Sequence, residues 1–265
     1  MNSILITGCN KGLGLGIVKA LVKKSNPPQI LIATCRDIGK AEVSIHWYTF
    51  SKLSQNPASV ELQSVANQNK FVHLLEINLK DLQAFPSFVQ QVSNIVKDNG
   101  LNVLFNNAGV SPKFTRLGLV KAEQLIDAFE TNTLAPIMLS KAFLPLLKQS
   151  AEKNSSKPLG IERAAIINMS SYLASMDMNT TGGLYPYRCS KVALNMATRT
   201  MSIDLKNDGI LATALHPGWV KTSMGGSNAP MEIEQSCTAI VDLLSKLGEE
   251  HNGNFYQYDG QKLPW

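Results

Sequence analysis

The chain has 265 residues, enough for one large α/β domain with a well-buried core. Hydrophobic residues make up 44% of it and charged residues 17%, a balance typical of globular proteins that excludes a largely disordered chain. The net charge of +5 comes without a long run of lysine or arginine, so we expect a small anionic ligand and no nucleic-acid partner.

Short apolar runs alternate with longer helical patterns along the chain. Residues 3–7 have the pattern of a buried strand, and the helix predicted after them carries Leu13, Ile17 and Leu21 on one face. The same patterns predict strands at 30–35, 71–77, 164–171, 211–218 and 255–260, a strand and turn at 102–109, and helices at about 81–98, 121–149, 186–206 and 232–247.

This alternation predicts an α/β protein with a doubly wound parallel sheet, the Rossmann fold, and helices on both faces. Near-continuously apolar strands such as residues 30–35 indicate burial on both faces of the sheet. No linker divides the chain, so we expect a single domain over residues 1–265. The stretch 44–59 is poorly helical and is interpreted as a surface excursion between the second and third strands.

The sequence lacks the patterns of a secreted or membrane protein. Its longest apolar runs are well short of the roughly 20 residues of a membrane span, and its first residues do not resemble a signal peptide. The four cysteines form no CxxC pair, and the four histidines share no metal-ligand spacing. We therefore expect a cytoplasmic protein with no metal site, no disulfide framework and no membrane partner.

Glycines are concentrated directly after the first predicted strand. Gly8, Gly12 and Gly14 follow the pattern G-x-x-x-G-x-G and lead into a helix. Glycine at these positions lets the backbone approach a pyrophosphate that a Cβ atom would obstruct. A tight strand-to-helix turn alone would need some of the same glycines, but their place after the first strand of an α/β chain favours dinucleotide binding.

The end of the second predicted strand indicates which dinucleotide is bound. A carboxylate there would bind both ribose hydroxyls and select NAD, but the chain has Cys35 and Arg36 instead. Arg36 can accommodate a 2′-phosphate through its charge and forked hydrogen bonds, and Lys11 adds a second cation. The two favour NADP(H), unless they are ordinary surface cations or Asp37 turns inward and opposes them.

Tyr187 and Lys191 are four residues apart in a predicted helix and therefore share a face. An ammonium beside the phenol would lower the pKa of Tyr187, which could then exchange a proton with a substrate oxygen. Ser170 and Ser171 end a predicted strand, and a hydroxyl there would hold a carbonyl oxygen or simply cap a helix. Tyr185 is a weaker candidate for the proton donor, because the residue four positions after it is not a lysine.

Together these motifs resemble those of the short-chain dehydrogenase/reductase family. The glycine pattern, Asn106-Asn107-Ala108-Gly109, Ser171, Tyr187-x-x-x-Lys191 and Pro217-Gly218 occur in that family's order and span nearly the whole chain. Stretches such as LNVLFNNAG and LHPGWVKTSMGG are similar to the sniffer-type carbonyl reductases within the family.

The resemblance implies a role for each matching residue. Tyr187 would be the general acid, and Lys191 would lower its pKa and bind the nicotinamide ribose. Ser171 would orient the substrate carbonyl, and Asn132 would hold a water of a proton relay behind the lysine. The cofactor residues implied are Gly8, Asn10, Lys11, Gly12, Leu13, Gly14, Arg36, Asn78, Leu79, Asn106, Ala108, Gly109, Pro217, Gly218, Val220 and Thr222, together with Tyr187 and Lys191.

The function implied is an NADPH-dependent carbonyl reductase, in a homodimer, that acts on reactive aldehydes, ketones or quinones. A hydroxysteroid, pteridine or other alcohol dehydrogenase would use the same machinery, and a non-catalytic NADP-binding regulator would need only part of it. The pair Asn78-Leu79 departs from the family, which usually has an aspartate before the leucine or valine. An asparagine carbonyl still accepts a hydrogen bond from the adenine amino group, so we expect adenine binding to survive, in a weaker form.

Overall fold

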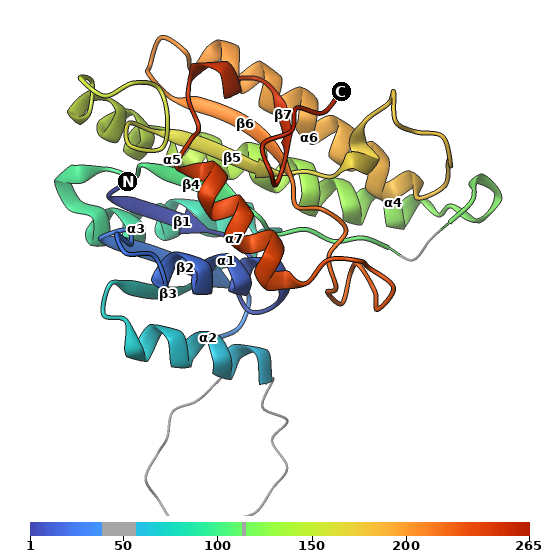
Figure 1. The fold of residues 1–265 in the computed structure, drawn as a ribbon, viewed down its shortest axis with the longest axis horizontal. Helices are drawn as coiled ribbons and strands as arrows, with labels where there is room; N and C mark the ends of the chain where they lie inside the picture. Colours follow the sequence, from blue (N-terminus) through green and yellow to red (C-terminus); the bar gives the residue numbers. More distant parts are fainter. Residues whose placement is uncertain (39–56, 113–114) are drawn as a thin grey trace, which may run out of the picture.

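The structure is a computed structural model that describes residues 1–38, 57–112 and 115–265. Its centre is a seven-stranded sheet in the order β3-β2-β1-β4-β5-β6-β7, in which every neighbouring pair is parallel (Figure 1). The strands are β1 (Ser3–Ile6), β2 (Ile30–Cys35), β3 (Val72–Glu76), β4 (Val103–Asn106), β5 (Ala165–Met169), β6 (Leu211–His216) and β7 (Phe255–Gln257).

Helices cover both faces of this sheet. They are α1 (Gly12–Val22), α2 (Pro57–Gln68), α3 (Phe85–Val96), α4 (Ala122–Phe129), α5 (Ala135–Lys153), α6 (Tyr185–Asp204) and α7 (Ile233–Leu244). In Figure 1, α7 crosses the near face of the sheet beside α1, against which it packs. A π-helical turn at Glu130–Leu134 joins α4 to α5. No helix among the described residues is both long enough and apolar enough to cross a membrane.

Alternation along the strands divides the core into two layers. In β1, Ile4 and Ile6 belong to the layer shared with α1 and α7, whereas Leu5 belongs to the layer shared with α3 and α5. In the second layer Phe88 and Phe143 pack edge to face, with ring centroids 5.6 Å apart. Burial on both faces explains why the central strands are mostly apolar, without a polar face, and it confirms the predicted doubly wound sheet.

The sequence patterns predicted the strands better than the helices between them. All seven predicted strands are present, most of them ending earlier than predicted. The helix predicted at 121–149 is one region interrupted by the π-helical turn and continued to Lys153. The helix α2 was missed, because its first residues fall in the stretch 44–59 that we interpreted as irregular. The rest of that stretch, up to residue 56, lies outside the described residues.

The strand order places a crevice above the centre of the sheet. The chain runs outward from β1 to β2 and β3, then returns to β4 on the other side of β1. Helices after β1 and β4 therefore leave in opposite directions, which opens a crevice at the carboxyl ends of these two strands. The loops after β4, β5 and β6 gather at the right side of the molecule in Figure 1, so residues far apart in sequence meet there.

Candidate active site

The predicted glycine loop forms a tight cradle after β1. Gly8 and Gly12 have φ of +72° and +59°, in the left-handed region that favours glycine. A Cβ built on Gly14 would lie 2.2 Å from the main-chain oxygen of Gly8 and 2.7 Å from Nδ2 of Asn107. Only a glycine at position 14 lets α1 begin this close to the loop, so these residues fit a bound pyrophosphate.

Replacing Gly14 by alanine is expected to destabilise this cradle. The new methyl group would overlap main-chain atoms, which cannot swing away as a flexible side chain would, so we expect a loss of about 1–3 kcal/mol in the free energy of unfolding. Binding of NADPH, measured by fluorescence titration, should weaken with it. Gly118→Ala is the matched control, because a Cβ there meets nothing within 4 Å. Equal unfolding free energies for the two variants would contradict the proposed steric role of Gly14.

Thr7 and Asn107 hold the loop in place. The Thr7 hydroxyl accepts hydrogen bonds from the main-chain N–H groups of Asn107 and Ala108, both at 3.0 Å. The side-chain amide of Asn107 donates in return to the main-chain oxygens of Thr7, at 2.8 Å, and Gly8, at 3.3 Å. These bonds join the loops after β1 and β4, and a Cβ on Gly8 would lie 3.0 Å from Ala108; cofactor contact by Ala108 stays a prediction.

Asn106 has a different environment from its neighbour Asn107. Its amide is buried and donates to Oδ1 of Asn168 on β5 at 2.8 Å and to Oγ of Ser140 on α5 at 3.4 Å. The side chain therefore belongs to a polar link between sheet and helix. Cofactor contact by Asn106 stays a prediction, and it falls to the main chain of this residue.

The N-terminus of α1 is well suited to an anion. Its N-cap is Lys11, which makes no side-chain cap hydrogen bond, and the first turn carries no acidic residue. The first N–H groups of a helix lack partners within the helix, and they carry the positive end of its dipole. Phosphate oxygens are the ligand that such an end binds, and the exposed Lys11 adds a full charge at its rim.

The predicted adenosine corner lies at the carboxyl ends of β2 and β3. Arg36 follows β2 and is exposed, so its guanidinium is accessible to a ligand. The main-chain N–H of Ile38 donates to Oε1 of Glu76 at the end of β3, which fixes the path of the chain after Arg36. Leu79 packs against the core below this corner, and Asn78 is exposed above it.

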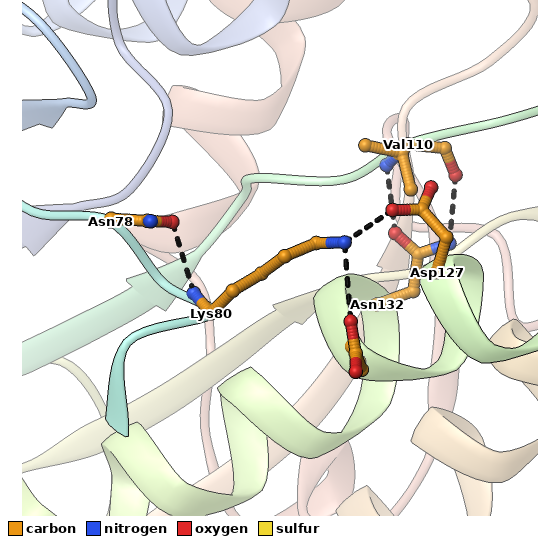
Figure 2. Close-up of polar contacts among 6 residues, drawn as sticks. Asn78, Lys80, Val110, Asp127 and Asn132 are labelled. Atoms are coloured by element: carbon orange, nitrogen blue, oxygen red, sulfur yellow. Dashed lines mark hydrogen bonds and ion pairs between the residues drawn. The ribbon is translucent and has the colours of Figure 1, made fainter. Parts of the chain in front are cut away.

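Lys80 connects the adenosine corner to the region of Asn132. Asn78 Oδ1 accepts the main-chain N–H of Lys80 at 3.2 Å, and Figure 2 shows the lysine side chain reaching across to α4. Its ammonium pairs there with Asp127 and with Glu130, the latter at 3.2 Å. The asparagine carbonyl is thus partly engaged in its own loop, but its second lone pair can still accept the hydrogen bond predicted from adenine.

The loop after β6 closes the crevice opposite the glycines. Thr222 lies against the glycine loop, since a Cβ on Gly12 would come within 3.6 Å of its Cγ2. Its hydroxyl accepts the N–H of Gly225 at 3.0 Å and so shapes the turn that follows. A cavity of about 360 Å³ opens between the two loops, lined by Lys11, Gly12, Lys221, Thr222, Ser223, Gly226, Ser227 and Ile233.

The remaining predicted residues of this loop shape its base. Gly218 has a φ of +86°, and a Cβ there would lie 3.0 Å from the sulfur of Met231. The main-chain oxygen of Pro217 accepts a hydrogen bond from the Ser236 hydroxyl at 2.6 Å. Val220 forms an isolated parallel β-bridge with Met231. The base of the loop is therefore fixed, which suits a wall that must stand at a defined distance from a ligand.

The three predicted catalytic side chains meet at the carboxyl end of β5. Ser171 follows β5, while Tyr187 and Lys191 lie on consecutive turns of α6. The Lys191 ammonium is 6.0 Å from the centroid of the Tyr187 ring, and the Ser171 hydroxyl lies near enough to the phenol to lower its pKa. Ser171 Oγ also accepts the N–H of Leu173 at 3.2 Å, so the two roles predicted for this serine, pocket and cap, occur together.

Burial sets the protonation of this group. It raises the pKa of Tyr187 to about 12, against the opposing effect of Ser171, and lowers the pKa of Lys191 to about 7. The prediction that Lys191 lowers the pKa of Tyr187 is thus wrong, because the pKa of Tyr187 is raised. The physical reason is first that the phenol of Tyr187 is itself desolvated. Lys191 is desolvated as well, and it donates at 2.7 Å to the main-chain oxygen of Met169.

Asn132 lies behind the lysine, in the π-helical turn. Its amide exchanges two hydrogen bonds with the main chain of Val110, both at 2.8 Å, as Figure 2 shows, and donates to Ser190 Oγ at 3.0 Å. A Cβ on Gly109 would lie 3.1 Å from Asn132 Oδ1 and 3.5 Å from Lys191 Nζ, so all three residues are in close contact. Such π-helical turns are frequent at functional sites, because they redirect a side chain out of the regular ladder.

Several residues that support the site were not found from the sequence. Thr133 donates to the main-chain oxygen of Ser190 at 2.7 Å, and Ser190 donates to that of Tyr187 at 2.8 Å, so this chain of bonds fixes the first turns of α6. The short runs TNT and YRCSK contain these residues, but nothing in their spacing separates them from ordinary helix positions.

Comparisons with known proteins agree with this geometry. The family model described as short chain dehydrogenase matches residues 30–233. The carbonyl reductase Sniffer of Drosophila melanogaster has 50% identity and a TM-score of 0.92, with all of both chains covered. An NADPH-bound carbonyl reductase from chicken fatty liver has 35% identity and a TM-score of 0.88, over 100% of this chain and 99% of that one. An uncharacterised oxidoreductase of Schizosaccharomyces pombe is 30% identical, over 98% of this chain and 96% of its own.

Proposed function

The chain belongs to the short-chain dehydrogenase family, and from this premise we propose that it is an NADPH-dependent carbonyl reductase. The observation that carries the proposal is the meeting of Ser171, Tyr187 and Lys191 at the carboxyl end of β5, on the same edge of the parallel sheet as the glycine cradle after β1. The names of two structural relatives, both carbonyl reductases, support the same substrate class.

The protein groups would act on the oxygen of an aldehyde, ketone or quinone. Bound NADPH supplies the hydride. Ser171 donates a hydrogen bond that holds the carbonyl oxygen, and the phenol of Tyr187 gives that oxygen its proton as negative charge develops there. Lys191, when protonated, stabilises the tyrosinate that remains. The raised pKa of Tyr187 suits this direction of reaction, since the phenol holds its proton until the substrate takes it.

A proton relay would then restore the phenol. Asn132 lies behind Lys191, and its Nδ2 group donates to Val110 and Ser190 while its Oδ1 accepts the N–H of Val110. We propose that this bonding holds the π-helical turn open, so that a main-chain oxygen of the turn positions the relay water. Replacing Asn132 by leucine should then slow proton return, and a solvent isotope effect equal to that of the wild type would argue against the relay.

The rate of carbonyl reduction is expected to fall as the pH rises through about 7, the pKa of Lys191. Below that pH the ammonium is present to stabilise the tyrosinate, and above it the amine is neutral, while Tyr187 stays protonated throughout. The pH profile of kcat/KM reports the ionisations of the free enzyme and measures this. Lys191→Met should remove the inflection, and an inflection that survives in this variant belongs to another group.

The choice of cofactor rests on the cations Arg36 and Lys11 and on the absence of a carboxylate directly after Cys35. Both side chains are exposed at the rim of the crevice, where a 2′-phosphate needs charge. A carbonyl panel assayed with NADPH and NADH in parallel tests the proposal. Turnover of several carbonyl compounds with NADPH is expected, and a clear preference for NADH would reject the cofactor proposed.

Two rival functions share parts of this site. A hydroxysteroid, pteridine or other alcohol dehydrogenase would differ only in the pocket walls, so a steroid ketone and a pterin belong in the same panel. A non-catalytic NADP-binding regulator would have no need for the full set of Ser171, Tyr187, Lys191 and Asn132. Absence of turnover with every carbonyl compound, despite tight NADPH binding, would favour the regulator.

We also propose a homodimer formed through α4 and α6. These two helices pack against each other, and each exposes large apolar side chains: Ile126 and Phe129 on α4, and Met196 and Ile203 on α6. Light scattering should give twice the mass of the chain, and Phe129→Glu should give a monomer, because it places a charge in an apolar interface. A wild-type protein that is monomeric would rule the dimer out.

A cytosolic setting stays a prediction. The thiols of Cys9, Cys35, Cys189 and Cys237 are all free, which suits a reducing compartment and the NADPH pool that the proposed reaction needs. Cell fractionation measures it, and recovery in a secreted or organellar fraction would overturn it.

A further inference from the structure

The segment 172–184 joins two catalytic residues and has no regular structure beyond one short 3₁₀ turn. It begins directly after Ser171 and ends three residues before Tyr187, so each of its ends lies next to a catalytic side chain in the chain. Two of its apolar side chains face solvent, Met176 at 68% exposure and Met178 at 41%. Long irregular segments next to a site often bind substrate, provided that the scaffold holds them in place.

Arg188 holds this segment to α6. Its side chain is only 8% exposed, and its guanidinium spans both ends of the segment. Nη1 donates to the main-chain oxygen of Leu173 at 3.1 Å, and Nη2 donates to Oγ1 of Thr181 at 2.9 Å and to the main-chain oxygen of Gly182 at 3.5 Å. The fork of the guanidinium allows one side chain to bind two places eight residues apart.

The position of Arg188 is unfavourable for a cation. It lies in the first turn of α6, near the positive end of the helix dipole. In the described part of the chain no carboxylate forms an ion pair with it, and its buried Nε has no hydrogen-bond partner. An apolar side chain would fill the same space without the cost of burying an unpaired charge. The hydrogen bonds to the segment are therefore the contribution that requires an arginine at position 188.

A second contact holds the middle of the segment. The main-chain oxygen of Trp265 accepts hydrogen bonds from the N–H of Met176 at 3.0 Å and from the hydroxyl of Ser175 at 3.2 Å. The Trp265 ring stacks on the buried Phe255, with centroids 5.7 Å apart. The segment is therefore fixed at both ends and in the middle, while its methionine side chains remain uncovered.

We propose that Arg188 is a positioning residue that fixes the segment 172–184 as a preformed apolar wall of the carbonyl pocket. Met176 and Met178 provide the surface of that wall, and their flexible thioethers suit bulky apolar substituents of varied shape. The enzyme therefore prefers carbonyl compounds with a large apolar group over small ones. This inference rests on the proposed reductase function, which it extends to a substrate class.

The test compares Arg188→Gln with the wild type on a bulky and a small carbonyl compound, phenanthrenequinone and propanal. We expect the KM for phenanthrenequinone to rise about tenfold, because hydrogen bonds from a charged group are lost and the wall is freed. The kcat values, the KM for propanal and the Kd for NADPH should stay close to the wild-type values. Arg188→Lys should recover part of the quinone affinity, since an ammonium reaches some of the three acceptors.

Two further variants make the result decisive. Arg199→Gln is the matched control, an exposed arginine on the same helix that donates to the main-chain oxygen of Gly253, and it should leave both substrates unaffected. The double variant Met176→Ala/Met178→Ala keeps the arginine and removes the apolar surface, so it should reproduce the rise in KM for the quinone alone. This variant carries the test if Arg188→Gln does not fold.

The outcomes separate the inference from the function on which it rests. Equal losses with both substrates in Arg188→Gln, or an unchanged KM for the quinone in the methionine variant, would overturn the proposed wall. A wild-type protein that oxidises NADPH with neither compound would reject the reductase function itself.

Discussion

Replacing Tyr187 by phenylalanine is expected to lower kcat for NADPH-dependent carbonyl reduction by about 10²–10⁴-fold, the usual contribution of a positioned general acid. The variant keeps the ring and therefore the packing of α6, and it removes only the hydroxyl that Ser171 contacts. Steady-state oxidation of NADPH with a quinone measures kcat, and fluorescence titration measures the Kd for NADPH, which should change little.

The neighbouring tyrosine provides the control for this experiment. Tyr185 lies in the same turn of α6, is partly exposed, and is followed four residues later by Cys189 instead of a lysine. Tyr185→Phe should therefore turn over carbonyl compounds at the wild-type rate. If Tyr187→Phe kept more than about a tenth of the wild-type kcat, Tyr187 could not be the general acid.

Replacing Arg36 by alanine is expected to raise the Kd for NADPH about ten- to a hundredfold and to leave the Kd for NADH unchanged. The estimate is the loss of about 1.5–3 kcal/mol for hydrogen bonds between charged groups, at 1.4 kcal/mol for each factor of ten. Arg36 is exposed at the carboxyl end of β2, where a 2′-phosphate would find it, and NADH has no group for it to bind.

A charge control separates local from general electrostatics. Lys70→Ala removes the same unit of charge from another exposed position before β3, so it should weaken neither cofactor measurably. A loss of affinity for NADPH and NADH alike in Arg36→Ala would show that the arginine supports the fold of the corner and does not select the 2′-phosphate. The affinity ratio of the two cofactors is therefore the deciding quantity.

The sequence was interpreted correctly where the role of a residue depends only on its own chemistry and on its near neighbours in the chain. A strand buried on both faces is apolar at nearly every position, so residues 30–35 indicated their strand without any knowledge of its neighbours. A helix brings positions four residues apart together, so the pairing of Tyr187 and Lys191 followed from their spacing. The glycines at 8, 12 and 14 likewise have few alternatives after a first strand.

Where the interpretation failed, the answer depended on partners distant in sequence. The pKa of Lys191 is set by its burial, and its ammonium is engaged by an oxygen of Met169 on β5, a different element, so the spacing to Tyr187 could not give the direction of the shifts. The helix α2 was missed because its amphipathic pattern is weak and short, and packing against β3 supports it. The side chain of Asn106 turned out to bond to β5 and α5.

The sequence by itself determined the α/β architecture, the succession of strands along the chain, and the residue types able to bind a dinucleotide and transfer a proton. These features follow from local periodicity and from the chemistry of single side chains. Only the tertiary structure decided which groups are desolvated and which polar atoms meet. Arg188 is the clearest case, because its three acceptors lie in a segment with no periodicity, and only the folded chain brings them to one guanidinium.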